Sequence, residues 1–204
     1  HVVSAKGVET DPEKIKAVVE WPTPTSVTHV RSLLGLAAYH RKFVKGFSEI
    51  AAPLHRLTGK NVRFRWDPCC QTAFQALKEK LTTSPVLALP TEDGPYVLDT
   101  DASNHSVGAV LSQVQDGVER VIAYGSRTFS PAEKNYCVTR KELLAIVTYV
   151  KTFKQYLLGR KFTIPTDHGA LRWLRNTPQP IGQQARWNEL LEELKNVNVI
   201  HAVP

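Results

Sequence analysis

The spacing of apolar residues changes near Gly94, and this change divides the chain between two predicted structural classes. Before Gly94, apolar residues recur every three or four positions, as in Val30, Leu33 and Leu34, which is typical of amphipathic helices. After it, short runs of β-forming residues are separated by turn signals such as SNHS and QDG. The sequence therefore predicts a mainly helical segment followed by a mixed α/β domain, in which helices cover a sheet.

Four helices are expected in the first segment, and capping side chains mark three of their starts. Asp11 and Asp67 each precede a proline, and Ser26 opens the second helix. The prolines of WPTPT end the first helix, because proline does not fit a helix interior. We further expect Gly46 to cap the end of the second helix. A short third helix is expected at residues 50–57, followed by a basic loop or strand at 62–66. VLALP is expected to form a short connecting strand.

The second segment is expected to contain three strands, a long helix, another strand, further helices and a last strand. Thr139 is predicted to cap the long helix, which runs to about Leu158 and ends at Gly159. A short helix through Leu171 and Leu174 and an amphipathic helix at 183–195 are expected to follow. The predicted strands are 96–101, 107–114, 120–127, 162–167 and 197–203.

Three acidic residues stand where predicted elements begin or end: Asp101 in LDTDAS, Glu142 in TRKELLAI and Asp167 in IPTDHGAL. A buried or half-buried carboxylate is costly unless positive charge meets it. Mg²⁺ prefers oxygen ligands and binds through a few carboxylates and substrate phosphates, and two such ions together can cleave phosphodiesters. Three carboxylates in strand, helix, strand order therefore suggest a shared cation.

Each of these acids also has a purely structural explanation. Asp101 is well suited to begin a turn. Glu142, expected in the first turn of its helix, is favoured there by the helix dipole, and Asp167 can cap the helix that follows it. Asp99 lies on the same strand face as Asp101, so periodicity alone leaves it a rival ligand. The metal-site hypothesis rests on the three acids taken together.

Positive charge is concentrated in the first segment. Residues 1–90 hold 13 Lys and Arg against 7 Asp and Glu, whereas residues 91–204 hold 13 against 12. A solvated basic surface would explain this, but nucleic acid is the sharper hypothesis, because phosphate neutralisation supplies sequence-independent affinity. The candidate backbone-binding residues, which are accompanied by the single acid Glu49, are Arg31, Arg41, Lys42, Lys45, Arg56, Lys60, Arg63 and Arg65.

Other features of the composition exclude some classes of protein. No apolar run approaches the length that a membrane-spanning helix needs. Three cysteines, Cys69, Cys70 and Cys137, are too few and too oddly spaced for a disulfide framework or a zinc site, which predicts an intracellular, reducing setting. Because the chain begins at His1 and contains no methionine, we expect it to be an internal piece of a longer polypeptide.

Several motifs in order carry a resemblance to a known family. LDTDAS, VIAYGSRTFSPAEKNY, TRKELLAIV and YLLGRKFTIPTDHGALRWL resemble the ribonuclease H domain of gypsy-type LTR retrotransposon Pol polyproteins. VRSLLGLAAYHRKFVKGFSEIAAPL and FRWDPCCQTAFQALKEKLTTSPVLALP resemble the reverse transcriptase thumb and connection of the same polyproteins. The resemblance implies a helical palm-end, thumb and connection segment at residues 1–84, followed by an α/β ribonuclease H-like domain with a mixed sheet at 85–204.

The resemblance also implies a chemistry. The family's metal-binding acids fall on Asp101, Glu142 and Asp167, which leaves Asp99 outside the site. The implied reaction is hydrolysis of the RNA strand of an RNA–DNA hybrid with two Mg²⁺ ions, for which Mn²⁺ can substitute. The implied partners are an RNA–DNA hybrid or other duplex nucleic acid and the remainder of the Pol polyprotein, which carries the polymerase upstream and integrase downstream. A cytoplasmic, particle-associated location is expected for an active element, and no membrane partner.

Two departures from the family pattern leave other functions open. The polymerase YxDD segment is expected upstream of His1, and the family's fourth acid is expected beyond the closing HAVP. A site with three carboxylates is expected to bind Mg²⁺ weakly and to work better in Mn²⁺. The alternatives are a catalytically silent nucleic-acid-binding remnant and a structural connector of a Pol polyprotein.

Overall fold

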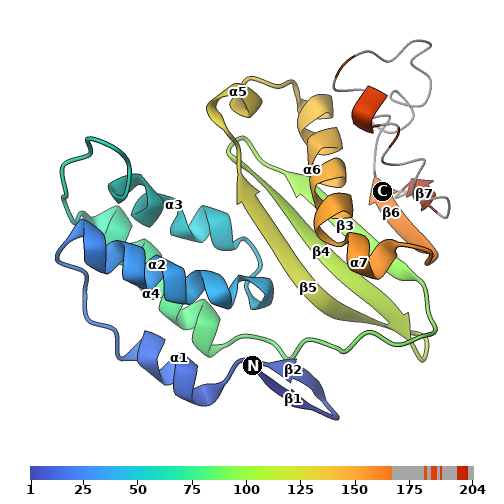
Figure 1. Cartoon of the computed structure of the whole chain (residues 1–204), viewed down its shortest axis with the longest axis horizontal. Coiled ribbons are helices and arrows are strands. Elements are labelled where there is room, and N and C mark those ends of the chain that lie inside the picture. Colours follow the sequence, from blue (N-terminus) through green and yellow to red (C-terminus); the bar gives the residue numbers. More distant parts are fainter. Residues whose placement is uncertain (167–181, 183–184, 188, 190–196, 202–204) are drawn as a thin grey trace. The chain divides into compact units, whose positions relative to one another are not determined.

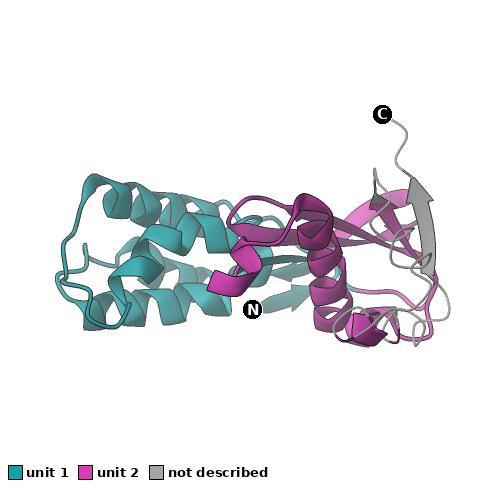
Figure 2. Cartoon of the chain, turned by 90° about the horizontal axis from the view of Figure 1, so that it is seen from above, with its two compact units in different colours: residues 1–89, 123–128 teal, residues 90–122, 129–204 magenta. Residues whose placement is uncertain are grey.

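The computed structural model describes residues 1–166, 182, 185–187, 189 and 197–201 (Figure 1). Its chain forms two compact units (Figure 2). Unit 1 comprises residues 1–89 and 123–128, and unit 2 comprises residues 90–122 and 129–204. Unit 1 is mainly helical, and unit 2 is built on a mixed sheet.

Unit 1 begins with a small antiparallel hairpin that the sequence pattern does not predict. Strand β1 (Val2–Ser4) pairs with β2 (Gly7–Glu9). Leu87, in the predicted strand VLALP, adds an isolated bridge to Val8 through N–H to carbonyl distances of 2.7 and 2.8 Å. VLALP therefore makes a β-bridge to the start of the chain and is not a strand of its own.

The helix starts that were predicted from capping side chains are confirmed. The Asp11 carboxylate accepts the N–H of Glu13, Ser26 Oγ accepts the N–H of His29, and Asp67 accepts the N–H of Cys70. Each bond satisfies a backbone donor that has no partner inside its helix. The α-helices of unit 1 are α1 (Pro12–Val19), α2 (Val27–Tyr39), α3 (Phe47–Leu57) and α4 (Pro68–Thr82).

The predicted end of the second helix and start of the third are wrong. Helix α2 ends at Tyr39, and the chain continues through the 3₁₀ turn η1 (Arg41–Phe43). Leaving the helix buries Phe43 and Val44, which are only 1% and 2% exposed. Gly46, at a φ of 70°, precedes α3 and does not cap α2, so α3 begins three residues earlier than expected. Residues 62–66 form a loop.

One apolar core holds unit 1 together. It contains the inward faces of all four helices, and Trp21, Phe64 and Trp66 pack against its rim. Burial of this apolar surface is the main force that stabilises the helices, since isolated helices of this length are marginal in water. Its fully buried large members are Leu33, Leu54, Phe74, Leu77 and Leu81.

Unit 2 is built on a five-stranded sheet in the order β5-β4-β3-β6-β7. Strand β3 runs antiparallel to β4 and parallel to β6, and β6 runs parallel to β7. All five predicted strands are present, with ends that differ by a few residues; residues 123–128 of β5 belong to unit 1. The strands are β3 (Tyr96–Ala102), β4 (Ser106–Gln115), β5 (Val118–Thr128), β6 (Phe162–Thr166) and β7 (Val197–His201).

The predicted long helix of unit 2 is wrong at both ends. Helix α6 (Val138–Thr152) has Cys137 as its N-cap, so Thr139 already lies inside the helix. It stops before Phe153, which packs on the Tyr149 ring at a centroid distance of 5.9 Å, and α7 (Lys154–Leu157) follows. A short helix, α5 (Pro131–Lys134), was not predicted, although SPAE carries the capping-box pattern that forms there.

The remaining predicted elements lie at the end of the chain. The helix through Leu171 and Leu174 lies outside the described residues. Within the predicted helix at 183–195, the described residues 185–187 and 189 are helical. Among the described residues, no helix is both long enough and apolar enough to cross a membrane.

Helix α6 covers one face of the sheet of unit 2 and packs on β3 and β4 (Figure 1). The Tyr149 hydroxyl donates to the carbonyl of Val107 at 2.9 Å, which fixes the helix against β4. Alternation along β3 sends Tyr96 and Leu98 into the core, where they are 2% and 0% exposed. The opposite face of β3 carries Asp99 and Asp101.

A buried amide closes the loop that leads into β3. The Gln113 side chain is fully buried, and its oxygen accepts the N–H of Thr91 at 2.9 Å. Its nitrogen donates to the carbonyls of Thr91, Asp93 and Gly94 at 3.1, 2.9 and 3.2 Å. One side chain therefore substitutes for several backbone partners of residues 91–94.

Replacing Gln113 by leucine should destabilise unit 2 by about 2–3 kcal/mol, because the backbone groups of Thr91, Asp93 and Gly94 lose their partner inside the protein. Urea unfolding followed by circular dichroism would measure the loss. The matched control is Gln155→Leu, an exposed glutamine of α7 in the same unit. Equal losses for the two variants would contradict the role of the buried amide.

Candidate functional site

Asp101 is the next-to-last residue of β3, with its backbone held in the sheet opposite Gly108 and its side chain exposed. The turn that follows is organised by Ser103, whose Oγ accepts the N–H groups of His105 and Ser106 at 3.2 and 3.0 Å. The carboxylate of Asp101 is therefore not the group that forms this turn. The carboxylate therefore leaves the core while the backbone stays paired in the sheet.

Asp99, the rival acid, is half-buried on the same face of β3 and lies opposite Val110. Asp101 lies opposite Gly108, which presents no side chain on the neighbouring strand. The structure therefore leaves more room for a ligand at Asp101 than at Asp99.

Glu142 lies on α6, beyond the first turn of the helix, which contains no acidic residue. The expectation that Glu142 belongs to the first turn was wrong, because α6 begins at Val138. The effect of the helix dipole falls off within the first turn, so it is a weaker explanation for this acid than the sequence suggested. Glu142 is half-buried, and the residues that follow it, Leu143 and Leu144, are buried in the core.

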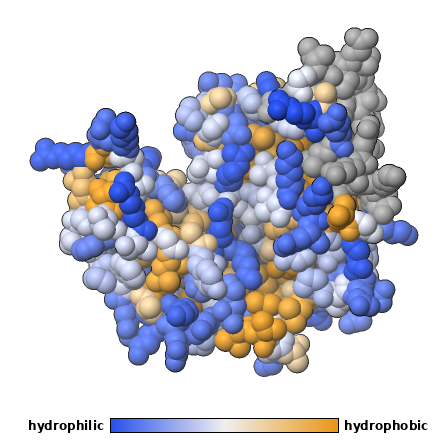
Figure 3. Space-filling view, viewed as in Figure 1, coloured by the Kyte–Doolittle hydropathy of each residue, from blue (hydrophilic) through white to orange (hydrophobic). Residues whose placement is uncertain are grey.

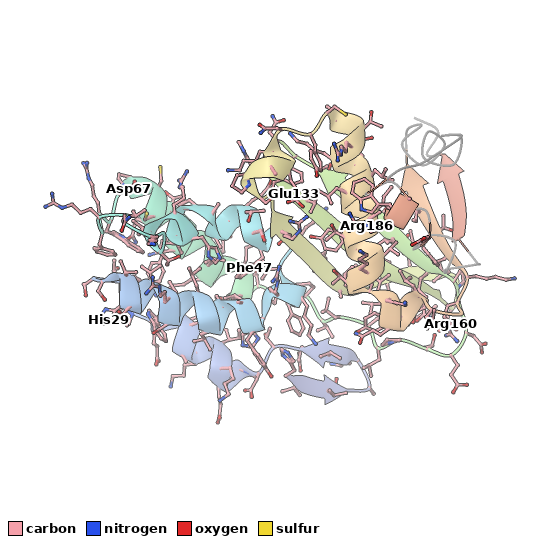
Figure 4. The ribbon with its side chains drawn as sticks, turned by 45° about the horizontal axis from the view of Figure 1, so that its top comes forward. His29, Phe47, Asp67, Glu133, Arg160 and Arg186 are labelled. Atoms are coloured by element: carbon pink, nitrogen blue, oxygen red, sulfur yellow. The ribbon has the colours of Figure 1, made fainter. Side chains whose placement is uncertain are left out.

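Asp101 and Glu142 lie at the same end of unit 2. The turn after β3 is joined to the segment before α5 by the Phe129 N–H, which donates to the carbonyl of His105 at 2.9 Å. The Phe129 ring in turn faces the ammonium of Lys141, the residue before Glu142, at 5.5 Å. In Figure 4, Glu133 of α5 marks this end of the unit, and Arg160 marks the opposite end.

The third predicted acid, Asp167, lies outside the described residues. Strand β6, parallel to β3, ends in the sheet at Thr166, one residue before it. Among the described residues, no three His, Cys, Asp and Glu side chains are grouped to hold a metal ion. The three-acid ligand set stays a prediction.

Two cation–aromatic pairs next to Glu142 were missed by the sequence analysis. The guanidinium of Arg140 lies 3.9 Å from the centroid of the Tyr136 ring, and the ammonium of Lys141 faces Phe129 as described above. Such contacts restrain a long basic side chain through the attraction between its positive charge and the face of the ring. The signal in the sequence was the alternation of aromatic and basic residues from Phe129 to Lys141. It is easily overlooked, because residues 91–204 as a whole have nearly balanced charge.

The eight basic candidates of unit 1 are exposed except for Lys42, which is half-buried. In Figure 3, strongly hydrophilic side chains project from the side of the helical unit that carries α3. Burial lowers the pKa of the Lys42 ammonium, which lies 5.1 Å from the centroid of the Phe43 ring. Seven of the eight residues therefore contribute exposed positive charge to the surface of unit 1, whereas the charge of Lys42 is less accessible.

Two of the eight basic side chains make hydrogen bonds inside unit 1. Arg31 donates to the carbonyl of Thr58 at 3.2 Å, and Arg41 donates to the carbonyl of Ser126. Arg41 also lies 6.0 Å from the centroid of the Phe47 ring. These residues contribute to folding as well as to surface charge, which makes them poor choices for a test of binding alone.

The sheet of unit 2 with α6 packed on it is an RNase H-like fold, and similarity to known proteins supports this assignment. Residues 66–164 match the model of the RNase H-like domain found in reverse transcriptase. The foamy viral protease-reverse transcriptase in complex with an RNA/DNA hybrid superposes with a TM-score of 0.80 at 21% identity, over 99% of this chain and 28% of that one. The form of the foamy viral protease-reverse transcriptase designated dRH, in complex with double-stranded DNA, gives 0.82, over 99% of this chain and 37% of that one.

The sequence relatives identify the family. Over 95% of its length the chain is 42% identical to the retrovirus-related Pol polyprotein from transposon 297 of Drosophila melanogaster. It is 38% identical over 94% of its length to the corresponding polyprotein from transposon gypsy of the same species. The chain spans 18% and 19% of those two relatives. It belongs to this family, as a fragment of a gypsy-type retrotransposon Pol polyprotein.

Proposed function

We propose that unit 2 hydrolyses the RNA strand of RNA–DNA hybrids during reverse transcription, with Asp101, Glu142 and Asp167 as its catalytic carboxylates. The observation that carries the proposal is the position of Asp101 and Glu142, which arrive from a strand and a helix at one end of an RNase H-like sheet. The products would carry 3′-hydroxyl and 5′-phosphate ends. The chain spans less than a fifth of the two relatives named above, so the activity of a whole Pol polyprotein is part of this proposal.

The residues present fit Mg²⁺ as a cofactor. Carboxylate oxygens are the hard ligands that Mg²⁺ prefers, and the exposed side chain of Asp101 can reach an ion without moving its backbone. When bound, two such ions supply activation of a water molecule and stabilisation of the departing 3′ oxygen. The chain's own role is to hold the negative charge of Asp101 and Glu142 at fixed points on rigid elements.

Duplex binding is assigned to the basic side chains of both units. The Arg140–Tyr136 pair lies beside Glu142, and unit 1 exposes Lys45, Lys60 and Arg63 among others. On α2, Gly35 has no atom within 4 Å of the position a Cβ would take, so a backbone partner can approach this helix closely. The viral reverse transcriptases with this fold, in complex with double-stranded DNA and with an RNA/DNA hybrid, support the assignment.

Cleavage of an end-labelled RNA–DNA hybrid tests the proposed reaction. We expect cleavage of the RNA strand in Mg²⁺ or Mn²⁺, no cleavage with excess EDTA, and none of double-stranded DNA of the same sequence. Activity that survives EDTA would contradict a carboxylate-held metal.

A catalytically silent nucleic-acid-binding role is the second candidate, and the exposed basic residues of unit 1 favour it because they do not depend on the carboxylates. Salt-dependent binding of the hybrid in the absence of any cleavage, in either metal, would support this role over the hydrolase.

Replacing Lys60, Arg63 and Arg65 together by alanine should weaken duplex binding similarly for unrelated sequences. All three are exposed on the loop between α3 and α4. The slope of log affinity against log salt should fall by roughly 0.9 for each lost phosphate contact. Fluorescence anisotropy of a labelled duplex at several salt concentrations measures both quantities.

The matched control replaces Lys14 and Lys16, two exposed basic residues of α1 that lie outside the predicted basic surface. This variant should keep the salt slope of the unaltered chain. An unchanged slope in the triple variant would show that the loop is only a solvated surface.

A further inference from the structure

His40 is a buried side chain that the proposed function does not use. It is 0% exposed at the end of α2. Among the described residues, neither its Nδ1 nor its Nε2 has a hydrogen-bond partner. An unpaired buried polar group costs about 1–3 kcal/mol, so its retention calls for an explanation.

The imidazole is enclosed by aromatic rings. The Tyr39 ring meets it edge-on at a centroid distance of 5.1 Å, the His1 ring at 5.4 Å and the tilted Phe43 ring at 6.5 Å. These neighbours solvate a neutral imidazole adequately through dispersion but offer no carboxylate to a charged one.

The backbone of His40 ties the corner between α2 and η1 together. Its N–H donates to the Ala37 carbonyl at 3.0 Å, and its carbonyl accepts the N–H of Phe43 at 3.0 Å. The next turn is closed by the Val44 N–H, which donates to the Arg41 carbonyl at 3.1 Å. The corner therefore carries Arg41 and Lys42, two of the basic candidates.

We propose that His40 is a pH-sensitive latch on the corner between α2 and η1. The neutral imidazole keeps this corner packed. Protonation of the imidazole opens the corner, so that Arg41 and Lys42 are no longer held in the positions they have in the folded corner. A charged imidazole cannot stay in the ring enclosure without a partner, so proton uptake and opening are coupled. The latch is separate from the carboxylate site and would regulate the basic surface of unit 1.

The charges that face His40 act in the required direction. Burial lowers its pKa most and Lys42 lowers it further, as does the amino-terminal ammonium in a chain that begins at His1, while Asp11 opposes them. In the open corner the imidazole regains its ordinary pKa of about 6.5. The open state thus binds the proton more readily, so the closed state is fully favoured above that value and loses stability as the pH falls below it.

Hydrogen exchange of the Phe43 and Val44 amides reports on the corner itself. Between pH 6.5 and 5.5, and down to the pKa of the closed state, their protection factors should fall by up to about tenfold per pH unit, since one proton is taken up on opening. His40→Phe, which keeps a ring but cannot be protonated, should show no such decline. His40→Gln is the second variant in case the larger ring does not fit.

An NMR titration of the His40 ring completes the test, and His55→Gln is the control, because burial and Arg41 lower the pKa of His55 as well. The His55 variant should keep the pH response of the corner. A ring pKa of His40 at or above about 6.5 would overturn the latch, as would equal pH responses in the unaltered chain and His40→Phe.

A duplex-binding readout separates the latch from the proposed function on which its consequence rests. Added protons strengthen phosphate binding in general, because they add positive charge. The latch predicts that acidification has the opposite effect once the His40→Phe variant is taken as the reference. The duplex affinity of the unaltered chain, divided by that of His40→Phe, should fall when the pH is lowered from 7.5 to 5.5. A chain that shows the exchange response but binds no duplex at either pH retains the latch and loses the proposed function.

Discussion

Asp101→Asn should abolish hybrid cleavage while leaving the fold intact. The amide keeps the shape of the side chain but removes a negative charge that the cations need. Loss of a metal-positioning carboxylate costs several kcal/mol of barrier, and about 4 kcal/mol corresponds to roughly a thousandfold in rate. Single-turnover cleavage of a labelled hybrid measures the loss. Circular dichroism of the variant should match that of the unaltered chain, which would show that the fold is retained. This is expected because the side chain of Asp101 is exposed.

The matched control is Asp99→Asn, on the same face of the same strand two residues earlier. It should reduce the rate far less, because the resemblance places the metal ligand on Asp101. Inactivation by Asp99→Asn with activity retained by Asp101→Asn would show that the ligands were assigned to the wrong acid.

Gly94→Ala should cost about 3 kcal/mol or more in the stability of unit 2. Gly94 has a φ of +99°, and a Cβ there would lie 2.2 Å from the carbonyl oxygen of Val114. The substitution therefore adds backbone strain to a collision with another strand, which can yield only if the sheet shifts. The free energy of unfolding, from chemical denaturation of both variants in parallel, is the relevant measurement.

Gly117→Ala separates strain from collision. Gly117 also has a positive φ, +76°, but nothing lies within 4 Å of its Cβ position. It should lose only about 1–2 kcal/mol, the cost of a left-handed conformation in a residue with a side chain. Similar losses at the two glycines would mean that the close approach of Val114 contributes nothing.

Local chemistry explains which elements were predicted well. The starts of α1, α2 and α4 depend on side chains adjacent in sequence, namely Asp11, Ser26 and Asp67, so the pattern alone located them. The start of α6 failed because its N-cap, Cys137, makes no side-chain capping bond that a pattern could show. The end of α2 failed because burial of Phe43 and Val44, a tertiary effect, stops the helix before Gly46.

The candidate site divides in the same way. The residue types and the order of Asp101 and Glu142 were evident in the sequence, and alternation along the strand placed Asp101 on the face away from Leu98. The position of Glu142 beyond the first turn was not evident, since it depends on where α6 begins. Nor could the sequence show that Arg140 lies over Tyr136, because only the folded segment sets that distance of 3.9 Å.

The sequence by itself determined the succession of a helical segment and an α/β domain and the capped helix starts, because these depend on neighbours within a few residues. Tertiary structure alone decided that the turn after β3 and the segment before α5 meet, through the hydrogen bond between Phe129 and His105, 24 positions apart. It also decided that His40 is sealed among rings without a hydrogen-bond partner among the described residues. Burial and strand register depend on contacts between residues far apart in the sequence, so a local sequence pattern does not determine them.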